Sequence, residues 1–194
     1  KNTHRIDYGS NMWWTTDEPY HWDDWLALQF FCALWTSGRG AANSSLWPAR
    51  ADISRPQWQG RILDGLVDTV YYGAGAFSSQ RDFRRTEILA RDTGLNVMTY
   101  ASVNRDTEDN SRTVEWVLDA WLHGADGVLP WQTLGNDDAL DSGDRSIGGG
   151  NALLVPGTRF GVPVVADIRL KALRDGQQEL PDVLRDKTEK RRRS

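Results

Sequence analysis

The chain has 194 residues, ten of them tryptophan, and a formal net charge of −4 at pH 7. Its length is sufficient for a domain with its own hydrophobic core, and the mild negative charge provides no general attraction for nucleic acid or for an anionic membrane surface. The longest apolar run is interrupted by Gln29 and follows two aspartates, so it is unsuited to crossing a bilayer. We therefore expect neither nucleic acid nor a membrane as a partner.

The first predicted elements are a strand and a helix. Aromatic and β-branched side chains predict a strand over residues 12–16, which ends at Asp17-Glu18-Pro19. An almost continuous apolar stretch then predicts a helix over residues 20–35. Because apolar side chains occupy most of the circumference of this helix, we expect other parts of the protein to cover it on several sides. Its single cysteine, Cys32, is expected to be a buried, inert thiol.

The rest of the chain alternates between short β-prone segments and helical ones. Further strands are expected over residues 48–53, 67–72, 96–103, 127–133, 152–155 and 162–166. Helices are expected over residues 57–63, 81–91, 113–123 and 167–174, the last ending before Gly176, and a Gly/Asp-rich loop over residues 135–151. The charged residues 181–194 are expected to be a disordered tail, and residues 1–180 the folded region.

This alternation predicts the fold class. Strands that alternate with helices form a parallel sheet with right-handed crossovers. The strands up to residue 133 recur roughly every 25–35 residues, which is typical of a (β/α)₈ barrel, but about five such strands are too few to close one. The prediction is therefore an α/β protein that is either an open sheet or the later part of a (β/α)₈ TIM-type barrel.

Asp17 and Glu18 are the strongest candidates for chemistry. Two adjacent carboxylates at the end of a parallel strand lie at the face where α/β barrels place their active sites. Crowded carboxylates raise one pKa, which suits a general acid at neutral pH. The alternative is that the segment only caps the following helix by accepting backbone hydrogen bonds.

Other polar and aromatic side chains lie at or just beyond predicted strand ends. A parallel sheet would bring these ends to one face, where aromatic rings beside carboxylates suit a sugar. The candidate substrate-binding residues are Asp52, Tyr72, Tyr100 and Trp131. The alternative for each aromatic residue is packing in the core.

Other kinds of site have no support in the sequence. The three histidines lack metal-ligand spacing, no G-x-S-x-G motif is present, and the glycine-rich segments follow neither phosphate-loop nor dinucleotide-binding spacing. We therefore expect no metal and no organic cofactor.

Several segments resemble the catalytic region of glycoside hydrolase family 123 and its uncharacterised relatives, in collinear order over nearly the whole chain. They are Asp17-Glu18-Pro19, Arg50-Ala51-Asp52-Ile53-Ser54, Gly65-Leu66-Val67-Asp68, the segment from Gly124 to Trp131, the segment from Asn151 to Gly157, and the segment from Ile168 to Gly176. The resemblance is strongest in the last three, whereas Asp-Glu-Pro alone is a weak motif.

The resemblance implies a (β/α)₈ glycosidase that acts on N-acetylhexosaminides, typically β-linked N-acetylgalactosamine. It implies retention of configuration by substrate-assisted catalysis, in which the substrate's own acetamido oxygen attacks the anomeric carbon. Asp17 would orient the acetamido group, and Glu18 would be the general acid/base. The resemblance also implies a secreted or periplasmic protein, although the sequence shows no signal-peptide pattern and the compartment stays open.

Two departures from the family pattern keep alternatives open. The first barrel strands of the family have no counterpart here, so we expect a half-barrel that pairs with an N-terminal segment of the same chain or of a partner chain. After Gly176, the segment Gln177-Gln178-Glu179-Leu180-Pro181 predicts an early helix end. The alternatives to an active enzyme are a non-catalytic carbohydrate-binding protein, a degenerate barrel relative, and a half-barrel that is inactive alone.

Overall fold

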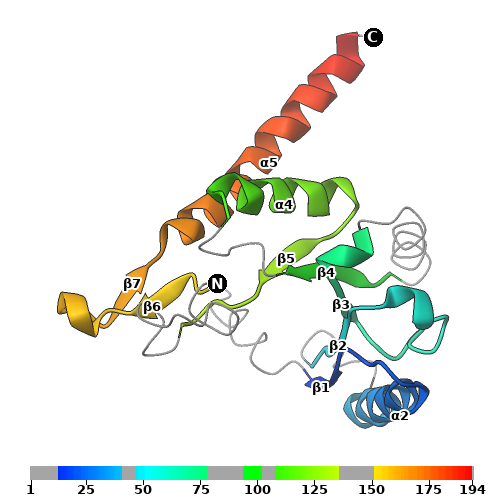
Figure 1. Ribbon diagram of the computed structural model, residues 1–194. Coiled ribbons are helices and arrows are strands. Elements are labelled where there is room, and N and C mark those ends of the chain that lie inside the picture. The colour runs from blue at the N-terminus through cyan, green and yellow to red at the C-terminus, as the bar shows by residue number, and fades with distance from the viewer. Residues whose placement is uncertain (1–12, 41–46, 78–93, 102–107, 136–150, 194) are drawn as a thin grey trace. The chain divides into compact units, whose positions relative to one another are not determined.

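The computed structural model describes residues 13–40, 47–77, 94–101, 108–135 and 151–193 (Figure 1). The chain divides into two compact units: the first is Lys1–Tyr100 with His123–Gly127, and the second is Ala101–Leu122 with Val128–Ser194. The predicted helix over residues 81–91 and nearly all of the predicted loop over residues 135–151 lie outside the described residues.

The predicted parallel sheet is confirmed. Among the described residues it has five strands in the order β1-β2-β3-β4-β5, which is also their order in the chain. The strands are β1 (Trp13–Asp17), β2 (Ala49–Ile53), β3 (Thr69–Gly73), β4 (Asn96–Ala101) and β5 (Gly127–Pro130). A short 3₁₀ turn, η3 (Pro56–Trp58), stands where a helical piece over residues 57–63 was expected, and η4 (Ala74–Phe77) follows β3. Among the described strands β1 and β5 end the sheet, so barrel closure remains a proposal.

In the first unit, the two faces of the sheet differ in chemistry. Successive side chains of a strand point to opposite faces, and residues in register on neighbouring strands share a face. One face carries side chains that are at most 1% exposed: Ala51, Ile53, Val70, Tyr72, Val97 and Thr99. The alternate positions carry mainly polar and aromatic side chains, among them Arg50, Asp52, Tyr71 and Tyr100, with Met98 beside Tyr71. Only a sheet covered on its apolar face satisfies this pattern, and its polar face is then available for function.

Helix α2 (Trp22–Arg39) packs one narrow stripe into the core of the first unit. Trp25, Leu28 and Cys32 are at most 2% exposed, and burial raises the pKa of the Cys32 thiol to about 11, as expected for an inert thiol. The helix begins after His21, where Asp24 accepts hydrogen bonds from the backbone N–H groups of Tyr20 and His21 at 3.1 and 2.7 Å. It ends at Gly40, whose φ of 68° favours glycine.

The prediction that this helix is covered on several sides is wrong for the described residues. Trp22, Leu26, Phe30 and Leu34 are between 42% and 62% exposed. Their spacing of four residues places them on one flank of the helix, away from the buried stripe. A helix that packs on a single sheet buries only the stripe that faces it, whatever the composition of its other sides.

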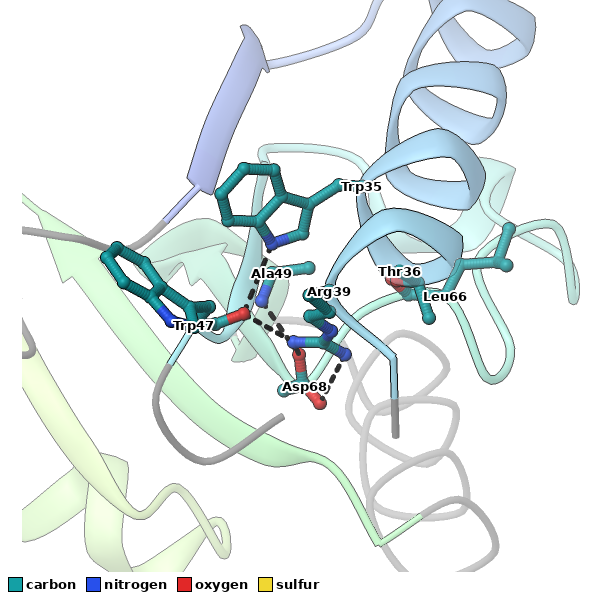
Figure 2. A network of polar contacts seen from close by, with 7 residues as sticks. All are labelled: Trp35, Thr36, Arg39, Trp47, Ala49, Leu66 and Asp68. Carbon is teal, nitrogen blue, oxygen red and sulfur yellow. Dashed lines mark hydrogen bonds and ion pairs between the residues drawn. The ribbon is translucent and has the colours of Figure 1, made fainter. Parts of the chain in front are cut away.

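An ion-pair network fixes the C-terminal end of α2 to the start of the neighbouring strands (Figure 2). Arg39 pairs with Asp68 through two hydrogen bonds, Nη1 to Oδ2 at 2.5 Å and Nη2 to Oδ1 at 3.0 Å. Asp68 also accepts the N–H of Ala49, the first residue of β2, at 2.7 Å. The carbonyl of Trp47 accepts hydrogen bonds from Arg39 at 2.6 Å and from the indole of Trp35 at 3.1 Å. One guanidinium thus sets the position of α2 relative to β2 and β3.

The described residues of the second unit include two helices and a two-stranded antiparallel ribbon. The ribbon pairs β6 (Leu154–Pro156) with β7 (Val164–Ala166), and the 3₁₀ turn η5 (Thr158–Phe160) lies between them. Helix α4 (Asn110–Leu122) buries Thr113, Trp116, Val117 and Ala120, the periodic face expected of an amphipathic helix. It packs against α5 (Ile168–Arg193).

The predicted end of the last helix at Gly176 is wrong. Helix α5 continues to Arg193, so residues 181–193 are helical where a disordered tail was expected. A Cβ atom on Gly176 would lie 3.1 Å from Cβ of Val117 and 3.2 Å from Cα of Val114. Glycine is therefore needed here for the close approach of two helices and not as a helix stop. Among the described residues, no helix is both long and apolar enough to cross a membrane.

We predict that Arg39→Met lowers the free energy of unfolding by about 2–4 kcal/mol, because it leaves the Asp68 carboxylate without its cation. The Arg39 side chain is only 6% exposed. Arg112→Met is the matched control, since Arg112 pairs with Glu115 on the surface of α4 and both side chains are at least 60% exposed. Arg112→Met should lower the free energy of unfolding by less than about 1 kcal/mol. Equal losses in urea denaturation of the two variants would contradict a structural role for the Arg39 pair.

Candidate active site

The parallel register aligns three polar residues on neighbouring strands. Asp17 of β1 lies opposite Asp52 of β2, which in turn lies opposite Tyr71 of β3. The pairing of β1 with β2 is irregular between Trp14 and Asp17, as in a β-bulge. The expectation that the strand ends place Asp17 close to Asp52 is thus confirmed.

Glu18 owes its orientation to an unusual backbone conformation. Its φ of 44° lies in the left-handed region, and its N–H donates to the carbonyl of Asp52 at 3.1 Å. A residue that continued the strand would point away from the face that Asp17 occupies. A left-handed residue other than glycine costs on the order of 1 kcal/mol and is found mostly where the surrounding structure holds it, often at functional sites.

Tyr100 of β4 contacts the carboxylate of Glu18. Its hydroxyl donates a hydrogen bond to Oε1 of Glu18, although the two residues are 82 positions apart in the chain. Tyr100 also lies beside the backbone of Gly73 on β3, since a Cβ atom there would lie 3.5 Å from the Tyr100 hydroxyl oxygen. The structure therefore brings together the predicted residues Glu18 and Tyr100 in direct contact.

The side chain of Asp52 forms an ion pair with Arg50. Nε and Nη2 of Arg50 bind its two carboxylate oxygens at 2.6 and 2.5 Å. The guanidinium carbon of Arg50 also lies 3.9 Å from the centroid of the Tyr71 ring, a cation–π distance. Asp52 is 6% exposed, so its role is to hold Arg50 and to support the site more than to meet a ligand.

The crowding of charges alters the pKa values of two groups. Burial raises the pKa of Asp17, and the neighbouring carboxylates of Glu18 and Asp52 raise it further, while the Arg50 guanidinium opposes them. Burial also raises the pKa of Tyr100, together with its hydrogen bond to Glu18. The carboxyl group whose pKa is raised is Asp17, which is not the residue that the resemblance assigns as general acid.

Two of the predicted substrate-binding residues are not part of this group. Tyr72 is fully buried on the apolar face of the sheet, where its hydroxyl donates to Oε1 of Gln59 at 3.0 Å. It is a core residue because it is adjacent to Tyr71 and so points to the opposite face. Trp131 is 52% exposed and belongs to the second unit, so we give it no role in this site.

Sequence reasoning did not propose Arg50. Arg50 stands two residues before Asp52 on the same strand, and this spacing places both side chains on one face of a sheet. That spacing was the signal available in the sequence. Among the described residues, no group of three or more His, Cys, Asp or Glu side chains is arranged to hold a metal ion. The carboxylates of this site and the Tyr100 hydroxyl can transfer protons and form hydrogen bonds.

Comparisons with known proteins add no relatives. No family model, no curated protein and no solved structure matches the chain. The resemblance to glycoside hydrolase family 123 therefore rests on the sequence motifs alone, and activity has to be argued from the site.

We predict that Asp17→Asn stabilises the protein at neutral pH. A raised pKa in the folded state means that Asp17 stabilises the fold when protonated and that this contribution is lost as the pH rises through its folded pKa. At pH 7 the variant should gain up to about 1 kcal/mol, limited by solvent screening of a partly exposed carboxylate. The gain should vanish below the ordinary Asp pKa of 3.8.

The matched control for this measurement is Asp24→Asn. Hydrogen bonds from the backbone of His21 and Tyr20 lower the pKa of Asp24. Replacement of Asp24 should therefore change the stability of the protein in the opposite direction. Asp24→Asn should destabilise the protein at pH 7, with the difference shrinking as the pH falls through the pKa of Asp24. Thermal melts between pH 2.5 and 8 compare the two variants. A loss of stability at pH 7 in Asp17→Asn would contradict the electrostatic description of the site.

Proposed function

We propose that the chain is the later part of a (β/α)₈ glycoside hydrolase that acts on N-acetylhexosaminides, with β-linked N-acetylgalactosaminides as the first candidates. The observation that carries this proposal is the contact between Tyr100 and Glu18 beside Asp17, at the carboxyl ends of parallel strands. In α/β barrels this end of the sheet holds the active site. The motif resemblance adds the substrate class.

In the proposed first step, Glu18 is the general acid. It gives a proton to the glycosidic oxygen while the bond from that oxygen to the anomeric carbon breaks. The carbonyl oxygen of the substrate's 2-acetamido group forms a new bond to the anomeric carbon, which gives a cyclic oxazolinium intermediate. No nucleophile from the protein is required for this step.

Asp17 stabilises that intermediate. Its carboxylate accepts a hydrogen bond from the acetamido N–H, whose positive charge increases as the ring closes. In the second step Glu18 takes a proton from a water molecule that attacks the anomeric carbon. The acetamido group is released, and the sugar leaves with its configuration retained. Tyr100 fixes the carboxylate that transfers the proton in both steps.

The proposal includes a partner segment. Among the described strands, β1 pairs with β2 and with no other strand. An unpaired strand edge recruits another strand. We therefore propose that an N-terminal segment of the same chain, or a partner chain, supplies the strands that complete the barrel.

We predict that Glu18→Gln lowers kcat by about 10²–10⁴-fold on N-acetylhexosaminides, since it removes the proton donor. The loss should be larger for a disaccharide than for a 4-nitrophenyl glycoside, because nitrophenolate leaves without help from an acid. Turnover of both is measured with protein that includes any upstream sequence. Glu115→Gln, an exposed carboxylate on α4, is the matched control and should keep full activity.

The same assay separates the alternatives. Wild-type protein should hydrolyse the N-acetylated substrate. It should not hydrolyse the matching hexoside that lacks the acetamido group. Full turnover by Glu18→Gln would contradict its role as the acid. A well-folded, full-length wild type that binds N-acetylhexosamine without turnover would instead identify a non-catalytic carbohydrate-binding protein.

A further inference from the structure

The proposed reaction leaves the Arg50–Asp52 ion pair of the site without a role. Asp17, Glu18 and Asp52 are three carboxylates at neighbouring strand ends, and Arg50 is the guanidinium beside them. Like charges at short range disfavour ionisation of the group as a whole. A site that needs Asp17 as an anion therefore needs a nearby cation.

Arg50 is held by contacts on two strands. It binds both oxygens of Asp52 in a fork geometry, at 2.6 and 2.5 Å, and its guanidinium lies over the Tyr71 ring of β3. Only arginine combines a planar fork with stacking on an aromatic face. Its side chain is 20% exposed, so water screens it less than a surface charge.

The same contacts connect Arg50 to the proposed acid. Asp52, whose side chain Arg50 holds, accepts the N–H of Glu18 at its backbone carbonyl at 3.1 Å. That bond helps to keep Glu18 in its left-handed conformation, with the side chain in contact with Tyr100. Displacement of Asp52 would thus move the backbone from which Glu18 extends.

We propose that Arg50 is a positioning residue of this site: its fork holds Asp52, and through it the backbone of Glu18, while its positive charge favours the anionic form of Asp17. The positioning role rests on the function proposed above. The electrostatic role concerns Asp17 alone and can be measured without any substrate.

The charged and titratable groups of the site come from four strands, including β1, the strand of Asp17 itself. They are Glu18 after β1, Arg50 and Asp52 on β2, Tyr71 on β3 and Tyr100 on β4. Among those that act on Asp17, the two carboxylates raise its pKa and Arg50 lowers it. Loss of the Arg50 charge should therefore let Asp17 bind a proton at higher pH. The acidic limb of the kcat/KM profile should move upward with it, by the same number of pH units.

The test compares Arg50→Gln, Arg50→Lys and Arg61→Gln. The Asp17 carboxyl carbon is followed by ¹³C NMR from pH 2.5 to 8, with Asp17→Asn used to assign the signal. Arg50→Gln should shift the titration of Asp17 to higher pH. Arg61→Gln removes the same charge from a side chain that is 85% exposed and pairs with Asp64, and it should leave the titration of Asp17 and the turnover unchanged.

Arg50→Lys separates charge from geometry. Lysine keeps the charge but not the fork, so the titration of Asp17 should stay close to wild type while kcat falls about tenfold with little change in KM. If Arg50→Gln does not fold, Arg50→Lys decides alone: a wild-type kcat would overturn the positioning role. An unshifted Asp17 titration in folded Arg50→Gln would overturn the electrostatic role. A shifted titration in a protein without glycosidase activity would refute the proposed function and leave the electrostatic role intact.

Discussion

The rest of the first unit depends on the parallel pairing of its successive strands, from β1 through β4. Parallel strands end at the same edge, so residues from distant parts of the chain meet there without any local sequence signal. The contact between Glu18 and Tyr100, 82 residues apart, exists only because three successive strand pairs hold their register. The Arg39–Asp68 pair at the opposite ends of the strands supports this arrangement, since it ties α2 to the first residue of β2.

The two faces of the sheet contribute differently to the stability of the protein. The apolar face supplies hydrophobic stabilisation through fully buried residues such as Ile53 and Val70. The polar face carries features that cost stability: a left-handed Glu18, crowded carboxylates and an ion pair largely removed from water. Unfavourable features of this kind persist only where a stable scaffold holds them, and they are common where function requires them. The same reasoning makes Asp17 a group that weakens the fold at neutral pH while serving the proposed reaction.

Much of the fold could be predicted because it depends on local patterns. The β-prone segments, the amphipathic face of α4 and the alternation of strands and helices all reflect periodicity within short windows. What failed depends on neighbours distant in the chain. Whether the flank of α2 that carries Phe30 is covered, whether Gly176 ends a helix or admits a close helix contact, and which of Tyr71 and Tyr72 points into the core are all decided by packing. Of the predicted site, Asp17, Glu18, Asp52 and Tyr100 come together. Arg50 was missed because its spacing of two residues from Asp52 places both side chains on one face only if the segment is a strand.

The contact between Glu18 and Tyr100 is tested most directly by a double-mutant cycle. The free energies of unfolding of wild type, Glu18→Gln, Tyr100→Phe and the double variant are measured by urea denaturation at pH 7. A hydrogen bond from a tyrosine hydroxyl to a carboxylate predicts a coupling energy of about 1 kcal/mol or more. Effects of the two substitutions that add within about 0.3 kcal/mol would contradict the contact, and with it the arrangement of the proposed active site.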